Sequence, residues 1–449
     1  MYHGGFLNEG FSRARPHRMK TDPFAVFYPR RRLLLASLAA GFGMPVMAQF
    51  RVEVSGVGLT QLPVAVAGFR GEAASPVKIS AVIQTDLERS GRFKVVDAAG
   101  QTLDESSRPD LAVWRQRSAD SLAAGSVSRL ADGRFDVQFR LWDVVRGQDL
   151  GGQKFMVPAG DLRLVAHRIA DYIHEKLTGD KGVFSTRIAY VTKTSRQHTL
   201  WVADADGENA QTALVSPEPI ISPAWSPAGD QIAYVSFEAR KPVVYVHDVA
   251  TGRRRLLANF RGSNSAPAWA PDGRTLALTL SRDGGSQLFI MDASGGEPRR
   301  LTQSQAIDTE PVFAPDGRSL YFVSDRGGAP QIYRMPLSGG TPEPLTSPRT
   351  YSISPAISPD GRWLAYVART NGAFKLQVME LSTGAVTALT ETAADESPSF
   401  APNSRLIVYA TQQQGRESLM TTTLDGKIKA RLAGQDGDIR EPSWGPFQK

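Results

Sequence analysis

The residue types that most often carry out catalysis are sparse in this chain of 449 residues. It contains no cysteine, which excludes disulfides, thiolate nucleophiles and zinc–thiolate sites together. Four histidines follow residue 48, namely His167, His174, His198 and His247. His167 and His174 lie seven residues apart on an expected helix, whereas zinc binding on one helix face needs a spacing of about three or four. We therefore expect packing or surface roles for this pair, and the other two histidines occur singly.

Other signatures of enzyme active sites are also missing from the sequence. There is no Gly-x-Ser-x-Gly nucleophile elbow. The glycine-rich stretches 282–285 and 326–328 are followed by expected strands, so they lack the helix N-terminus that binds phosphate in nucleotide-binding loops. We expect no catalytic residue, no cofactor and no metal ion, and hence no enzymatic activity.

Pairs of acidic residues do recur, just ahead of expected strands. The pairs are Asp308 with Glu310, Asp395 with Glu396, and Asp438 with Glu441. In a ring of strands they would converge on one mouth of a central channel and could attract a cation or basic side chains. Ordinary solvated loop acids explain them equally well. The alternative to a non-enzymatic protein is an exported hydrolase or lyase that uses the channel as its active site, which would need a histidine or carboxylate pair there.

A repeated sequence phrase, Pro-x-(Trp, Phe or Ile)-x-Pro, predicts the strands that would position these residues. Its second proline falls at residues 227, 271, 315, 359, 402 and 446, so the spacings are 44, 44, 44, 43 and 44. An apolar strand follows each of the first five copies, and Asp-Gly in three of them favours a hairpin turn between the two strands. Third and fourth strands follow in most copies. Four short strands per ~40 to 50 residues are typical of β-propeller blades.

The two ends of the repeat predict a closed propeller. Ile188-Ala189-Tyr190-Val191 matches a second strand that has no leading strand before it. The segment Pro442 to Pro446 is a leading strand that has no second strand after it. Pairing the two completes a first blade, whereas an open array would leave both terminal edges unpaired. We expect an all-β six-bladed β-propeller over residues 184–449, closed by the C-terminal strand.

Residues 49–180 lack the repeat and contain helix signals, which predicts a small N-terminal α/β domain. Ser75-Pro76 suits the cap and first turn of a helix that ends at Gly91. A second helix is expected from Asp161 to its stop at Gly179. Strands are expected at 50–55, 62–67, 93–97, 121–129, 135–144 and 150–157.

The net charge of +7 is concentrated at the N-terminus. Residues 1–48 hold seven basic and two acidic residues, which leaves a net charge of +2 for the rest, so we expect no nucleic-acid binding. Three arginines at 30–32, an apolar stretch at 33–44 and a cleavage site after Ala48 have the layout of a signal peptide. Met19 is an alternative start, in which case residues 1–18 are not translated. Because the apolar stretch is shorter than the about 20 residues of a membrane-spanning helix, we expect export without membrane insertion.

A distinctive phrase spans the expected junction between the two domains. It reads Glu175-Lys176-Leu177-Thr178-Gly179, then Phe184-Ser185-Thr186-Arg187-Ile188-Ala189-Tyr190-Val191, with Glu441-Pro442-Ser443-Trp444 at the close of the chain. These residues resemble the TolB family of the Tol-Pal envelope system. The resemblance covers nearly all of residues 49–449. The junction phrase is specific, whereas peptidase propellers share the repeats. The resemblance to this family implies a non-enzymatic periplasmic adaptor that maintains outer-membrane integrity and envelope constriction during cell division.

The resemblance also implies that the propeller binds the peptidoglycan-associated lipoprotein Pal. In the family, loops that precede the leading strands build this face. The matching positions are Ser263, Asn264, Ala266, Thr309 and Glu310. Ser263 stands where the resemblance leads us to expect a histidine. Other outer-membrane proteins are further candidate partners.

The second implied partner is the inner-membrane protein TolA, which the N-terminal strand would bind. The matching residues are Gln49, Phe50, Arg51, Val52, Glu53 and Val54. Their alternation suits strand addition to the edge of a partner's sheet. They could equally form the first strand of the α/β domain, and both arrangements could hold in alternate states.

A carbohydrate-binding module at the peptidoglycan is a third possibility. Such a module would present exposed aromatic residues on one face. Trp225, Trp269 and Trp444 instead occupy the repeating strand position, where we expect burial.

Overall fold

The structure of the protein is a computed structural model that describes residues 52–54, 61–106, 108–413, 415–433 and 438–448. The expected signal peptide and residues 49–51 of the expected TolA-binding segment lie outside the described residues. Among the helices that are described, none is both long and apolar enough to cross a membrane.

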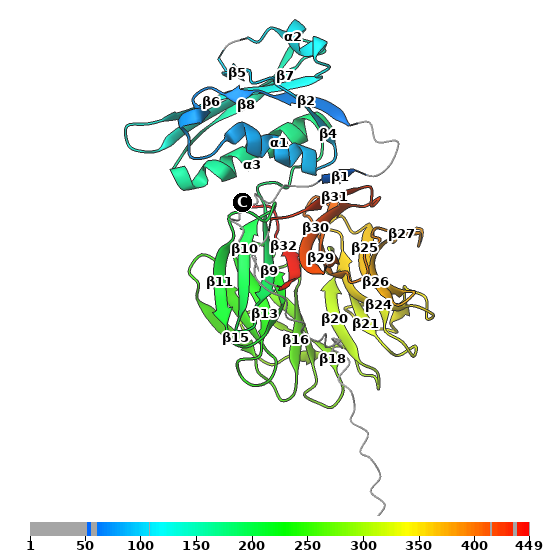
Figure 1. Cartoon of the computed structure of the whole chain (residues 1–449). Helices are drawn as coiled ribbons and strands as arrows, with labels where there is room; N and C mark the ends of the chain where they lie inside the picture. The colour runs from blue at the N-terminus through cyan, green and yellow to red at the C-terminus, as the bar shows by residue number, and fades with distance from the viewer. Residues whose placement is uncertain (1–51, 55–60, 107, 414, 434–437, 449) are drawn as a thin grey trace, which may run out of the picture. The chain divides into compact units, whose positions relative to one another are not determined.

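A five-stranded sheet with helices on both faces forms the N-terminal α/β part (Figure 1). Its strand order is β4-β2-β6-β7-β8, with β2 parallel to both neighbours and the later pairs antiparallel. The strands are β2 (Leu62–Val66), β4 (Phe93–Val96), β6 (Ser121–Arg129), β7 (Phe135–Asp143) and β8 (Gln148–Val157). The helices are α1 (Ile79–Arg89), α2 (Leu111–Gln116) and α3 (Leu162–Thr178). Short elements complete it: β3 (Gly68–Phe69), β5 (Thr102–Leu103), η1 (Glu72–Ala74) and η2 (Ala159–Asp161).

Strand alternation explains why the sheet has two cores. Val64 and Val66 of β2 are buried in one cluster with residues of α1 and α3. Ala65 lies between them in sequence and packs in a second cluster with Trp114 of α2. Since successive side chains of a strand point to opposite faces, α1 and α3 cover one face and α2 covers the other.

The sequence predicts the strands of this sheet and the end of α3, but it misplaces the start of α1. The predicted cap at Ser75-Pro76 is wrong, because α1 begins at Ile79. Glu72 provides the capping carboxylate: the Ser80 N–H donates to it at 3.1 Å and the Ser80 hydroxyl at 2.6 Å. Gly179 ends α3 in the left-handed region at φ 78°, as predicted. The short elements α2, β3 and β5 were not predicted.

Six blades follow, and each has four antiparallel strands of the repeat (Figure 1). Blade 1 contains β32 (Asp438–Trp444), β9 (Arg187–Lys193), β10 (His198–Asp204) and β11 (Gln211–Ser216). Blade 2 contains β12 (Ile220–Trp225), β13 (Gln231–Ser236), β14 (Val243–Asp248) and β15 (Arg254–Ala258). Blade 3 contains β16 (Asn264–Trp269), β17 (Thr275–Leu280), β18 (Gln287–Asp292) and β19 (Arg299–Arg300). The predicted propeller is therefore confirmed.

The remaining blades keep the same order. Blade 4 contains β20 (Asp308–Phe313), β21 (Ser319–Ser324), β22 (Gln331–Pro336) and β23 (Glu343–Pro344). Blade 5 contains β24 (Tyr351–Ile357), β25 (Trp363–Thr370), β26 (Ala373–Glu380) and β27 (Val386–Ala388). Blade 6 contains β28 (Glu396–Phe400), β29 (Leu406–Gln413), β30 (Arg416–Thr423) and β31 (Ile428–Arg431).

The C-terminal strand closes the ring. β32 pairs antiparallel with β9, with Trp444 opposite Ile188 and Arg440 opposite Val191. Trp444 and Ile188 share a buried cluster with Val408 of blade 6, so the seam is also packed. The predicted closure by the last strand is confirmed.

The tryptophans of the repeat link neighbouring blades. Trp225 is 9% exposed, and its indole N–H donates to the carbonyl of Ser443 at 3.1 Å. The indole N–H of Trp269 donates to the carbonyl of Ala224, also at 3.1 Å. Both carbonyls belong to the leading strand of the preceding blade. These side chains are therefore structural links, which argues against a carbohydrate-binding face built from them.

The junction phrase has a structural explanation at Asp171 of α3. Its carboxylate accepts hydrogen bonds from the backbone N–H of Phe184 at 2.8 Å and of Ser185 at 3.1 Å, and from the Ser185 hydroxyl. A Cβ at Gly182 would approach this carboxylate to 2.3 Å, so the close approach requires glycine there. The end of the α/β part and the first residues of blade 1 are thereby joined.

The N-terminal strand β1 (Val52–Val54) differs from the expectation that it starts the α/β sheet. It pairs antiparallel with β31, the outer strand of blade 6, with Val52 opposite Ala430 and Val54 opposite Ile428. Blade 6 therefore has five strands. Because an outer strand presents unpaired backbone groups, it can accept a short extended segment by strand addition.

Candidate protein-binding surfaces

A β-bulge interrupts each leading strand at the same place. These strands contact one another in a closed circuit at the inner side of the blades. In each, the register with the second strand shifts, and the residue before the first proline of the phrase has a φ between 47° and 55°. The six residues are Ser222, Ala266, Glu310, Ser354, Ser397 and Glu441. Because bulges redirect side chains and are costly for non-glycine residues, this ring is a functional candidate.

Two members of the bulge ring are glutamates that bind backbone groups of the next blade. The N–H of Ser354 donates to the Glu310 carboxylate at 2.6 Å, and the N–H of Ser222 donates to Glu441 at 3.3 Å. Burial, together with the nearby charge of Glu441, raises the pKa of Glu310 to about 7. Burial also raises the pKa of Glu441. A basic side chain brought to this ring would favour the ionised carboxylates and be attracted by them.

Four of the five residues expected to bind Pal lie on two neighbouring leading strands, β16 and β20, which contact each other, and Ser263 directly precedes β16. Ser263, Ala266 and Glu310 are half-buried and reach the surface. Asn264 is fully buried, and Thr309 is 8% exposed with its hydroxyl 3.4 Å from the hydroxyl of Thr279. Three of the five can therefore touch a partner as the structure stands.

Asn264 shapes the loop in front of β16. Its amide oxygen accepts from the N–H of Phe260 at 2.8 Å. Its amide nitrogen donates to the carbonyls of Phe260 at 3.0 Å and Gly262 at 3.1 Å. A side chain that is this fully satisfied within its own loop positions the loop and has few groups left for a partner.

Sequence reasoning missed three residues around the starts of β16 and β20, a surface that we call the rim. Ile307, just ahead of β20, is 36% exposed. Arg326 pairs with Asp308 at 2.8 Å, and its guanidinium lies 5.0 Å from the ring centre of Tyr333. Arg282 occupies the equivalent place one repeat earlier and lies over the ring of Phe260 at 5.1 Å. The shared spacing of 44 residues was the signal that could have found the two arginines.

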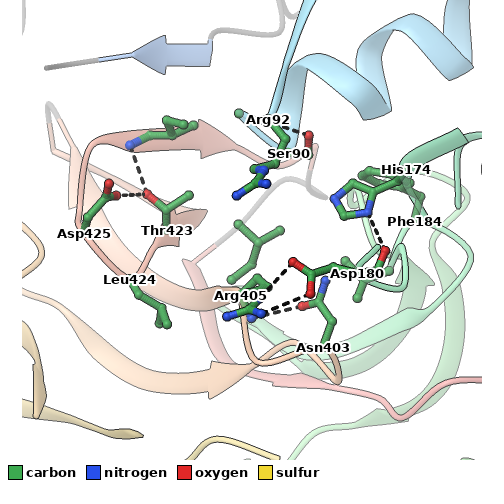
Figure 2. A pocket seen from close by; sticks show the side chains of 14 residues that line it. Ser90, Arg92, His174, Asp180, Phe184, Asn403, Arg405, Thr423, Leu424 and Asp425 are labelled. Atoms are coloured by element: carbon green, nitrogen blue, oxygen red, sulfur yellow. Dashed lines mark hydrogen bonds and ion pairs between the residues drawn. The ribbon is translucent and has the colours of Figure 1, made fainter. Parts of the chain in front are cut away.

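The site of the N-terminal strand adjoins a cavity of about 250 Å³, shown in Figure 2. Ile428, which is opposite Val54 in the strand pair, lines this cavity. A Cβ at Gly91 would lie 1.9 Å from the Cδ1 atom of Ile428, so the end of α1 packs directly on β31. The carboxylate of Asp180 pairs with Arg405 at 3.0 Å on another wall. The edge that holds β1 is therefore in contact with the α/β part.

Comparisons with known proteins agree with the junction phrase. Residues 174–448 match the family described as the TolB beta propeller domain, and residues 50–150 match the TolB amino-terminal domain. The chain is 81% identical over 420 residues to the Tol-Pal system protein TolB of Albidiferax ferrireducens, covering 94% of this chain and 99% of the relative. It is 79% identical over 419 residues to that of Polaromonas sp. strain JS666, covering 93% and 98%. A crystal structure of TolB from Acinetobacter baumannii superposes with a TM-score of 0.81 at 36% identity, over 89% of this chain and 100% of that chain.

Proposed function

The chain belongs to the TolB family of the Tol-Pal system, and from this premise we propose that it is a non-enzymatic periplasmic adaptor which links Pal to TolA. In this role it contributes to outer-membrane integrity and to envelope constriction during division. The N-terminal residues 1–48 serve as a cleaved signal peptide. One end of the adaptor is the propeller rim and the other is the N-terminal strand.

The observation that carries the proposal is the pairing of β1 with the edge of blade 6. This short segment is held by backbone hydrogen bonding of the kind that strand addition to a partner would use. Residues Gln49 to Val54 bind TolA when Val52–Val54 leave β31. The same segment is thus either docked on its own propeller or available to TolA.

The Pal face is the rim around Ser263, Ala266 and Glu310. Ile307 supplies exposed apolar surface there, and Arg282 and Arg326 supply cationic groups braced by aromatic rings. Asn264 and Thr309 hold the two loops in shape. Mixed apolar and charged surface of this kind is typical of protein-binding rims.

Binding measurements with purified partners test both ends. A variant that lacks residues 49–54 should lose TolA binding and keep Pal binding. Glu310→Lys should weaken Pal binding and leave TolA binding unchanged. It should also lower the melting temperature, because the Ser354 N–H of the next blade loses its acceptor. Equal TolA binding by the truncated protein would refute the assignment of the strand, and unchanged Pal affinity in Glu310→Lys would refute the assignment of the rim.

The buried histidines support a non-enzymatic role. Within the described part of the chain, His167, His174 and His247 are 5% exposed or less. The carboxylates of Glu310 and Glu441 are engaged by backbone amides of adjacent blades. The competing function, a hydrolase or lyase with its active site at the inner ring, predicts turnover in a substrate screen that Glu310→Gln abolishes.

A further inference from the structure

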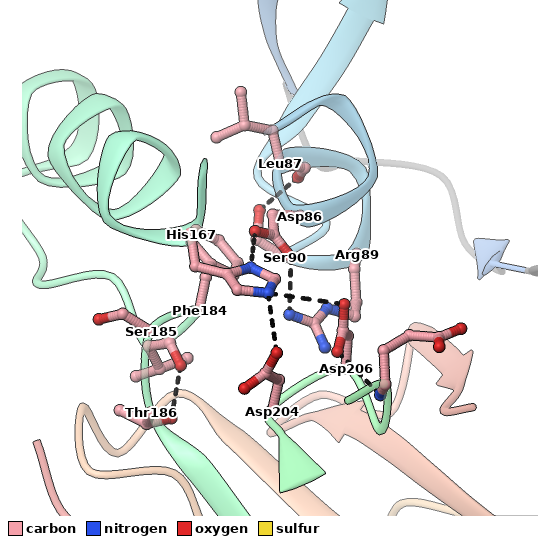
Figure 3. Close-up of polar contacts among 12 residues, drawn as sticks. Asp86, Leu87, Arg89, Ser90, His167, Phe184, Ser185, Thr186, Asp204 and Asp206 are labelled. Carbon is pink, nitrogen blue, oxygen red and sulfur yellow. Dashed lines mark hydrogen bonds and ion pairs between the residues drawn. The ribbon is translucent and has the colours of Figure 1, made fainter. Parts of the chain in front are cut away.

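Six charged side chains from three separate segments converge between the α/β part and blade 1. Figure 3 shows five of them, Asp86, Arg89, His167, Asp204 and Asp206. Asp86 and Arg89 come from α1, and Arg163 and His167 come from α3. Asp204 ends β10, and Asp206 lies in the turn that follows it. Asp86, His167 and Asp206 are at most 2% exposed, and Arg89 is 4% exposed. Burial of charge at this level is costly unless every charge is paired.

The contacts within the α/β part are short. His167 Nδ1 lies 2.5 Å from a carboxylate oxygen of Asp86. The other oxygen of Asp86 accepts a hydrogen bond from Arg89 at 2.9 Å. His167 is therefore fixed to α1 by a hydrogen-bonded ion pair.

The contacts that reach blade 1 are longer, with one exception. His167 Nε2 is 3.7 Å from Asp204 and 3.9 Å from Asp206. Arg163 Nε is 3.5 Å from Asp204, while its terminal nitrogen hydrogen-bonds Asp206. At these distances the histidine is held to blade 1 by charge attraction and not by a hydrogen bond.

The charges in this cluster balance when His167 is protonated. Three carboxylates, Asp86, Asp204 and Asp206, then face two guanidinium groups and one imidazolium. Asp86, His167 and Asp206 also place one ligand atom each within 4.8 Å of one another, as a metal site would. Arg89 and Arg163 already neutralise those carboxylates, so a cation there would have to displace both guanidinium groups.

We propose that these six side chains form an electrostatic clasp that fixes the α/β part on blade 1, and that loss of the proton on His167 opens it. Deprotonation leaves three carboxylates against two arginines, and two of the three, Asp86 and Asp206, are buried. On the blade 1 side, Asp204 is already partly exposed, whereas the buried Asp206 carboxylate regains solvation only when blade 1 separates from α3. The tight pair of His167 with Asp86 stays within the α/β part. The clasp therefore opens at the contacts of His167 and Arg163 with blade 1, which include the hydrogen bond of Arg163 to Asp206.

The pH range follows from the groups that face His167. Burial alone lowers its pKa, but Asp86, Asp204 and Asp206 outweigh burial and raise the pKa to about 10 from an ordinary 6.5. The opposing charges are Arg89 from α1 and Arg163 from α3. A raised pKa in the docked state means that the stabilisation is complete below about 6.5 and is lost as the pH rises towards about 10. The clasp is therefore closed at neutral pH and opens in alkali.

Distance measurements between two spin labels test the clasp directly. The chain has no cysteine, so Ser128→Cys in the α/β part and Ser195→Cys in blade 1, both exposed, give two unique labelling sites. We expect one narrow distance distribution at neutral pH and a broader, longer one at pH about 10. In the same labelled chain, His167→Gln should give the broad distribution already at neutral pH.

Two further variants distinguish an open clasp from a damaged fold. The double variant His167→Gln with Asp204→Asn has two carboxylates against two arginines, so it should recover a narrow distribution. His198→Gln in blade 1 is the matched control and should behave as the parent does. A narrow distribution for His167→Gln at neutral pH, or no recovery in the double variant, would overturn the proposal, whatever the outcome of the partner-binding tests.

Discussion

The carboxylates of Glu310 and Glu441 link adjacent blades by hydrogen bonds and place negative charge at the ring of bulge residues. Each binds the N–H of a bulge residue one blade further on. That N–H would otherwise be unpaired, because the bulge breaks the strand register there. The same burial that makes the hydrogen bond possible penalises the ionised form. Each carboxyl group therefore favours its protonated form, and a cationic group of a partner would favour the ionised form instead.

Glu310→Gln should stabilise the fold in a pH-dependent way. The pKa of Glu310 in the folded protein is about 7, above its ordinary 4.5, so folding stability falls as the pH rises from about 4.5 through 7. A glutamine keeps an acceptor for the Ser354 N–H and cannot ionise. We expect the free energy of unfolding to rise by roughly 1 to 3 kcal/mol above pH about 7 and to change little at pH about 4.5. Urea unfolding at several pH values measures this.

The exposed Glu343 in β23 provides the matched control. Glu343→Gln removes one carboxylate from the same propeller without removing a buried one, so its unfolding curves should follow the parent at every pH. If Glu310→Gln does the same, the Glu310 carboxyl is solvated and its pKa is ordinary.

At the scale of elements, the sequence predicts most where a repeat constrains it. The recurring prolines and the Asp-Gly turns fix the start of each leading strand and hairpin, so all six blades and the closing strand could be predicted. The partner of β1 could not, because three residues of alternating pattern suit any exposed strand edge. The cluster around His167 was missed for a related reason: Asp86 and His167 are 81 residues apart and meet only once α1 and α3 have packed. The six bulge residues recur at the spacing of the repeat, but the sequence alone does not reveal that their φ angles are positive.

Lys429→Glu should release β1 from blade 6. In the β1–β31 register, Lys429 is directly opposite Glu53, so the variant places like charges across the pair. Like charges directly opposite destabilise a strand pair by roughly 0.2 to 1 kcal/mol. In the proposed function, docking on β31 and binding to TolA compete for the same segment. We therefore expect TolA affinity to rise up to about fivefold, with Pal binding unchanged. Titration calorimetry with both partners checks this.

Arg196→Glu controls for the change in net charge. Arg196 is exposed in the turn between β9 and β10 of blade 1, outside the β1–β31 pair. Its TolA affinity should match that of the parent. Equal affinities for Lys429→Glu and the parent would mean that docking on blade 6 does not limit access to TolA.

At the scale of the whole chain, the propeller connects the two proposed partner sites, which lie towards opposite ends of its leading strands. The proposed Pal rim surrounds the starts of β16 and β20. The α/β part contacts the turn after β28, where Arg405 pairs with Asp180 and the Asn403 amide donates to the Lys181 carbonyl. The chain passes through the six blades in order, and the non-covalent pairing of β32 with β9 joins its last strand to its first. This pairing therefore determines whether the six blades form one cooperative unit.

Removal of Glu441–Lys449 should therefore damage both ends of the adaptor. The deletion removes the part of β32 that pairs with Ile188 and Ala189, so the first part of β9 loses its partner strand. It also removes Trp444 from the buried cluster of Ile188 and Val408. Loss of a buried tryptophan alone costs about 3 to 5 kcal/mol, a large part of the stability of an ordinary domain. We expect a lower and broader thermal transition, weaker Pal binding, and self-association through the free edge of β9. A chain shortened only by Gln448 and Lys449 retains Trp444 and Phe447, so it should melt and bind as the parent does. If the longer deletion also melts and binds normally, the blades hold together without the seam, and the ring is not the unit that carries the function.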